Sequence, residues 1–110
     1  MLPKKKRLTT EAFDRFFSIG KRFHSEHLQL IHTPLPEFHG SIVVGKKVYK
    51  TAVKRNRLRR QLYAVLYGLH RNGLLTGVYI VIAKPQAKTV EASELCAELR
   101  TLVGRTVDVT

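Results

Sequence analysis

The hydrophobic positions of the chain follow a helical period in two long segments. Residues 51–69 carry apolar side chains three or four positions apart, and residues 90–103 do the same. Such a stripe is typical of a helix that buries one face. We therefore expect two amphipathic helices, the second ending at Gly104. The stripe residues are Leu58, Leu62, Val65, Leu66 and Leu69 in the first segment, and Ala92, Leu95, Cys96, Leu99 and Leu102 in the second.

A shorter helix is predicted near the amino end, over residues 10–19. Glu11 and Asp14 stand near its start, where the helix dipole favours negative charge. Gly20 is a suitable residue to end it, since glycine adopts the backbone conformations that terminate helices at little cost. The chain is thus expected to hold three helices.

Three further segments show strand patterns. Residues 26–33 are rich in apolar side chains in rough alternation, and Pro34 and Pro36 end the segment. Residues 38–44 include a run of three β-branched side chains. Residues 78–83 are apolar throughout, which predicts a strand in the centre of a sheet. Strands interleaved with helices predict an α+β fold in which helices cover a sheet.

The composition is that of an ordinary folded domain. Of 110 residues, 44% are hydrophobic and 25% charged, so we expect residues 1–110 to form a single domain. No apolar run approaches the ~18–20 residues that span a membrane, and no apolar stretch follows the basic start as in a secretory signal. Cys96 is the only cysteine, which excludes an intramolecular disulfide. These features predict a cytoplasmic protein.

The charge is what departs from that ordinary background. Twenty Lys and Arg oppose eight Asp and Glu, giving a formal net charge of +12 and a pI near 10.4. Between Glu37 and Glu91 there is no acidic residue, and eleven Lys or Arg occupy that interval. A polyanion is the expected partner, and nucleic acid is the commonest one.

Eight of these basic residues fall within the fifteen positions 46–60. On a helix, Lys50, Lys54 and Arg57 share one edge, and Arg60 extends it away from the apolar stripe. That edge is suited to follow a phosphate backbone. A merely solvated helix face normally mixes charges of both signs, and here no acid is near in sequence. Arg55 falls inside the apolar arc beside Asn56, a poor helix-interior residue, which suggests a shaped RNA contact.

Four motifs in this order resemble the protein family of bacterial ribonuclease P. The sequence from Ala52 to Leu62, AVKRNRLRRQL, is similar to the family's Arg-Asn-Arg signature helix, and Gly45-Lys46-Lys47-Val48 precedes it as in the family. The segment YIVIAKP, residues 79–85, resembles the family strand that ends in Ala-Lys/Arg-Pro, and residues 2–8, LPKKKRL, resemble its amino terminus. The resemblance therefore covers nearly the whole chain.

The resemblance implies a fold and an activity that the residues alone do not give. The implied fold is a two-layer α-β sandwich with a mixed sheet of about four strands, three helices and a left-handed β-α-β crossover. The implied activity is endonucleolytic removal of the 5′ leader from precursor transfer RNA by a ribonucleoprotein. In that enzyme the RNA subunit holds the active site and binds the Mg²⁺ ions, so the protein is expected to hold no catalytic residue, metal or cofactor of its own. We expect a protein monomer in a 1:1 complex with the RNA.

The resemblance also assigns site residues. Those expected to face the catalytic RNA are Lys46, Lys47, Lys50, Lys54, Arg55, Asn56, Arg57, Arg59 and Arg60. For the single-stranded leader the family pattern points to Phe13 and Phe17, with Lys5, Lys6 and Arg7. Aromatic faces stack on any base, as a general processing enzyme needs. Core packing is the alternative for Phe13 and Phe17, and it is the favoured interpretation of Phe16. Leu30-Ile31 stand where the family often has a further aromatic residue.

Other interpretations are weaker but distinguishable. A structural RNA-binding protein of ribosomal type would share the size, charge and fold class. A DNA-binding module would insert the basic helix into the major groove, usually as a dimer. A protein-only nuclease would need a cluster of catalytic groups that the sequence does not show. His24 and His27 are suitably spaced for a metal, but no partner pair stands at a useful distance.

Overall fold

The computed structural model describes residues 10–73 and 75–107. Among them no helix is both long and apolar enough to cross a membrane. In chain order the elements are helix α1 (Thr10–Ile19), strands β1 (Lys21–His24), β2 (Leu28–Thr33) and β3 (Phe38–Val43), helix α2 (Ala52–Arg71), strand β4 (Gly77–Ala83), the 3₁₀ helix η2 (Pro85–Thr89) and helix α3 (Ala92–Val107).

The four strands form one mixed sheet in the order β1-β2-β4-β3. Strand β2 pairs antiparallel with both β1 and β4, whereas β3 and β4 are parallel, with Phe38 opposite Gly77 and Val43 opposite Ile82. Parallel neighbours need a crossover connection, and α2 supplies it. The predicted α+β class and the mixed sheet of four strands are confirmed.

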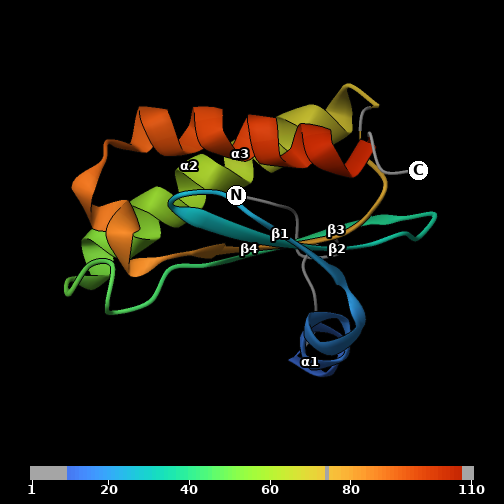
Figure 1. The fold of residues 1–110 in the computed structure, drawn as a ribbon, viewed down its shortest axis with the longest axis horizontal. Helices are drawn as coiled ribbons and strands as arrows, with labels where there is room; N and C mark the ends of the chain where they lie inside the picture. Colours follow the sequence, from blue (N-terminus) through green and yellow to red (C-terminus); the bar gives the residue numbers. More distant parts are fainter. Residues whose placement is uncertain (1–9, 74, 108–110) are drawn as a thin grey trace.

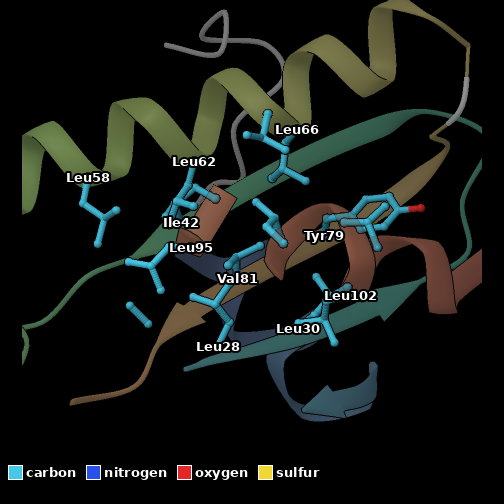
Figure 2. Packing of buried hydrophobic residues seen from close by; sticks show 14 of the residues in the cluster. Leu28, Leu30, Ile42, Leu58, Leu62, Leu66, Tyr79, Val81, Leu95 and Leu102 are labelled. Atoms are coloured by element: carbon cyan, nitrogen blue, oxygen red, sulfur yellow. The ribbon is translucent and has the colours of Figure 1, made fainter. Parts of the chain in front are cut away.

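Helices α2 and α3 lie side by side on one face of the sheet, and α1 lies on the opposite face (Figure 1). The larger core fills the space beneath α2 and α3. Figure 2 shows Leu58, Leu62 and Leu66 of α2 pointing toward side chains of the sheet and of α3 such as Val81 and Leu95. Each of these five side chains is at most 2% exposed, and burial of this kind is the main favourable term in folding. The stripe predicted for α2 is thus buried, with Leu69 half-buried at its end.

Helix α1 packs on the sheet through a smaller cluster. Phe16 is 6% exposed and contacts a buried group made of Ile31, Val78 and Ile80. Gly20 ends the helix as predicted, its amide donating to the carbonyl of Phe16 at 2.9 Å. A Cβ atom at Gly20 would collide with the side chain of Ile31, so glycine is what allows α1 to lie this close to β2.

One strand was missed, and some predicted boundaries differ from the structure. Strand β1 was missed because it is a short edge strand whose residues are mostly exposed, so it shows no hydrophobic run. The strand expected from residue 26 begins at Leu28. Helix α3 does not end at Gly104 but continues to Val107, because Leu102, Val103 and Thr106 are buried and keep its last turn packed.

Candidate nucleic-acid interface

The loop before α2 is held in place by Arg55. Its Nη1 donates to the carbonyl oxygens of Tyr49 and Lys50 at 2.9 and 2.8 Å. The loop itself begins with a turn, in which the amides of Val48 and Tyr49 donate to the carbonyl of Gly45. Arg55 is half-buried, in agreement with its place in the apolar arc of the helix. The structure therefore gives this arginine a fastening role, while its predicted RNA contact stays a prediction.

Among the other predicted contact residues, Asn56 and Arg59 bond to each other. Asn56 is exposed, and its Oδ1 accepts a hydrogen bond from Nη2 of the half-buried Arg59. This bond joins side chains three residues apart on the same face of the helix. The remaining basic side chains are exposed and define what we call the basic surface: Lys46, Lys47, Lys50, Lys54, Arg57 and Arg60.

The basic surface has no carboxylate partner among the residues that the structure describes. Across residues 10–73 and 75–107, every ion pair within 4.0 Å involves a histidine, and no described Lys or Arg approaches a described carboxylate that closely. Positive charges that repel one another destabilise the free protein slightly and create a field that attracts a polyanion.

The predicted aromatic site lies apart from the basic surface. The rings of Phe13 and Phe17 are half-buried, with centroids 5.8 Å apart and planes at 27°, so they stack on each other. They belong to α1, on the face of the sheet opposite α2 (Figure 1). Phe16 is the buried member, as predicted. Lys5, Lys6 and Arg7 lie outside the described residues.

Arg22 of β1 joins this aromatic site and was not among the predicted site residues. Its guanidinium carbon lies 4.8 Å from the ring centroid of Phe17, and Nη2 donates to the Phe17 carbonyl at 2.9 Å. A guanidinium over a ring is attracted by the negative π face and keeps further donors for an anion. No sequence signal marked Arg22, because β1 itself was not recognised.

A hollow of about 300 Å³ opens between the start of α2 and the start of α3, and we call it the α2–α3 hollow. Two of its lining residues, Lys54 and Arg57, belong to the basic surface. Helical spacing could have predicted that Gln61 shares their face, but the approach of Tyr49 and Ala92 depends on the fold. The lining residues are Tyr49, Lys54, Arg57, Leu58, Gln61 and Ala92.

His27, which the sequence spacing suggested as a metal ligand, is paired with a carboxylate. Nδ1 of His27 lies 2.8 Å from Oε1 of Glu98, whose other oxygen accepts from the hydroxyl of Ser25 and the amide of His27. The hydrogen bond to Glu98 raises the pKa of His27 against the opposing effect of burial. Burial would raise the pKa of Glu98, but these hydrogen bonds outweigh it and lower that pKa. The cluster fastens the β1–β2 turn to α3.

No group of three or more His, Cys, Asp or Glu side chains in the described ranges is arranged to hold a metal ion. His32 is directed inward, with Nδ1 3.0 Å from the carbonyl of Val78, and burial lowers its pKa. The Cys96 thiol packs against the larger core, and burial raises its pKa because it disfavours the charged thiolate.

Comparison with known proteins decides the family. The family model described as ribonuclease P matches residues 2–107. The chain belongs to the ribonuclease P protein family. A ribonuclease P protein component of Synechococcus sp. strain JA-2-3B'a(2-13) is 38% identical over 113 residues, covering 96% of this chain and 84% of the relative. One from Microcystis aeruginosa is 36% identical over 100 residues, covering 84% and 82%.

Solved ribonuclease P proteins have the same fold. The protein of Staphylococcus aureus superposes with a TM-score of 0.82 over 92% of this chain and 94% of that chain, at 22% identity. The protein of Thermotoga maritima gives a TM-score of 0.72 over 90% and 96%, at 23% identity. The resemblance to ribonuclease P inferred from four motifs is confirmed, together with the fold class that it implied.

Proposed function

We propose that this chain is the RNA-binding protein component of a ribonuclease P ribonucleoprotein that removes the 5′ leader of precursor transfer RNA. The observation that carries the proposal is the basic surface, a group of exposed cations without a described carboxylate partner, in a chain whose family match spans residues 2–107. Such a surface binds phosphates through charge and leaves sequence reading to other contacts.

The basic surface would bind the ribonuclease P RNA near its active site. In this proposal the RNA subunit binds the Mg²⁺ ions that activate water, and the protein lowers the repulsion between the two RNA molecules. Arg55 holds the loop before α2 against the start of the helix for that contact. One copy of this single-domain protein would bind one RNA, in the cytoplasm.

The aromatic site would bind the leader. Phe13 and Phe17 each keep part of the ring exposed, and Arg22 adds a cation beside them. Stacking on aromatic rings holds single-stranded nucleotides without preference for sequence, which suits an enzyme that processes many precursors. The sheet separates this site from the basic surface, so the protein would contact leader and catalytic RNA through different faces (Figure 1).

The test is cleavage of a precursor transfer RNA at low Mg²⁺ concentration. A bacterial ribonuclease P RNA alone, this protein alone, and the two together are compared for release of the 5′ leader. We expect efficient release only from the combination. If the protein binds the RNA tightly but adds nothing to cleavage, a structural role of ribosomal type replaces the proposal. Cleavage by the protein alone would show that the chain carries catalytic groups itself.

A further inference from the structure

The α2–α3 hollow is walled by one face of a helix and closed by two other segments. Arg57 and Leu58 each lie three or four residues from both Lys54 and Gln61 along α2, so these side chains share one face of the helix. Tyr49 comes from the loop before α2, and Ala92 is the first residue of α3. The hollow is therefore formed only when both helices are docked.

Chemically, the lining combines three kinds of surface. Lys54 and Arg57 are exposed cations, and the structure describes no carboxylate within 4.0 Å of either. Tyr49 is half-buried against the core and Leu58 is only 2% exposed, so they form an apolar wall and floor. Gln61 is exposed and carries an amide that can both donate and accept hydrogen bonds.

The wall at Tyr49 is held rigidly. Arg55 donates to the Tyr49 carbonyl at 2.9 Å, and the Tyr49 amide donates to Gly45, so both backbone groups of this residue are engaged. A preformed aromatic wall costs little to order when a ligand binds. The rigid part of the hollow is its apolar side, while the two cations stand on flexible stems.

We propose that the α2–α3 hollow binds one unpaired nucleotide of the ribonuclease P RNA. Its phosphate contacts Lys54 and Arg57, its base lies against Tyr49, and the Gln61 amide hydrogen-bonds to the base edge. The volume of about 300 Å³ is at the small end of ligand sites, which fits one nucleotide and not a longer strand. A bare phosphate would leave the apolar wall and the amide unused. This inference rests on the proposed function.

Glu91 and Glu94 are exposed residues close to Ala92 in the sequence, and they lower the net positive charge around the start of α3. They pair with neither cation within 4.0 Å among the described residues, so the cations remain available to an anion. Their presence disfavours a multiply charged anion without an apolar part. A nucleotide in a strand carries a single charge on its phosphate and a large uncharged base, in agreement with this lining.

The test fills the hollow without changing any charge. Ala92→Leu places a larger side chain in the lining, and Ala97→Leu makes the same change at an exposed position five residues further along α3. We expect Ala92→Leu to weaken binding of ribonuclease P RNA roughly fivefold or more, with a decrease in the slope of log affinity against log salt no larger than the ~0.7–0.9 of one phosphate contact. Ala97→Leu should match the wild type in both.

A second pair of variants guards against misfolding. Gln61→Ala removes the amide from an exposed position, and Gln86→Ala removes an exposed amide outside the hollow. Thermal unfolding of all four variants shows which remain folded. If Ala92→Leu does not fold, the comparison of Gln61→Ala with Gln86→Ala decides, and equal RNA affinities of those two overturn the inference.

Direct binding is measured by NMR with adenosine and uridine monophosphates at millimolar concentration, and with inorganic phosphate. Shifts at Tyr49, Ala92 and the Gln61 side-chain amide with the nucleotides, absent in Ala92→Leu, support the inference. Equal shifts with phosphate alone overturn the nucleotide assignment and leave an anion site. If the wild type binds no ribonuclease P RNA, the proposed function itself fails. If it binds and Ala92→Leu binds equally well, only the hollow is wrong.

Discussion

Arg55 and Arg57 are two residues apart in one basic helix, yet the structure predicts opposite consequences for their loss. Arg55 donates through Nη1 to the carbonyl oxygens of Tyr49 and Lys50, whereas Arg57 is exposed at the rim of the α2–α3 hollow. We predict that Arg55→Ala mainly lowers the free energy of unfolding. Arg57→Ala should mainly lower the affinity for RNA.

The magnitudes follow from the contacts. A hydrogen bond to a charged group contributes ~1.5–3 kcal/mol, but both acceptors of Arg55 lie near the surface, where water replaces a lost donor, so we expect a loss of about 1–2 kcal/mol in total. Arg57→Ala should change stability by less than ~0.5 kcal/mol, as surface substitutions usually do. Loss of one phosphate contact should reduce the slope of log affinity against log salt by roughly 0.7–0.9.

Two measurements separate the roles. Urea unfolding followed by circular dichroism gives the free energy of unfolding, and filter binding of ribonuclease P RNA over a range of KCl concentrations gives the slope. Arg55→Lys is the control, because it keeps the charge but lacks the planar guanidinium. If Arg55→Ala leaves stability unchanged and reduces the slope as much as Arg57→Ala does, the fastening role is wrong and both arginines bind RNA.

Three further predictions concern α1 and the β1–β2 turn. Phe13→Ala or Phe17→Ala should weaken binding of leader-containing precursor roughly fivefold or more beyond any effect on mature transfer RNA, measured by competition; equal effects on both RNAs would assign the rings to packing. Phe16→Ala should lower the free energy of unfolding by about 3–5 kcal/mol, because the ring is 6% exposed, and a loss under ~1 kcal/mol in urea would contradict its place in the core. His27→Gln should cost stability most where His27 is protonated. Its folded pKa is raised above 6.5, so the advantage of the wild type is complete below that pH and decreases as pH rises through the raised pKa. The pKa of Glu98, the hydrogen-bond partner of His27, is lowered. The stability that the Glu98 carboxylate contributes is therefore lost only at acidic pH, as pH falls through that lowered pKa. Thermal unfolding from about pH 5 to about pH 9 checks this, and a difference independent of pH would exclude a charged pair.

Elements with a strong local pattern could be predicted from the sequence. The bounds of α1 agree with the structure, and α2 and β4 are within two residues, because their apolar spacing leaves one arrangement for burial. Strand β1 could not be predicted in this way. It is an edge strand held by backbone hydrogen bonds to β2, and only Phe23 among its four residues packs against the larger core.

For the site, the sequence indicated where the positive charges lie, but not which of them make hydrogen bonds within the protein. The exposed cations of the basic surface were predicted because an acid-free run of Lys and Arg is visible without a fold. The bond from Arg55 to the loop was not, since it depends on how residues 45–50 turn back toward α2. The separation of the aromatic site from the basic surface was also hidden, because the crossing of the sheet between α1 and α2 is a property of the topology.

The position of β4 determines when the chain can fold on the ribosome. Strand β4 lies between β2 and β3, yet both of these strands and α2 are synthesised before it. Until residue 83 has left the ribosome, β2 and β3 lack the strand that lies between them. Their inner edges are then unpaired, and the apolar side chains of β4 are missing from the core. Non-local pairing of this kind forms late, and open strand edges favour aggregation in the meantime. The sheet therefore stays incomplete, with the inner edges of β2 and β3 unpaired, until β4 is available to both of them.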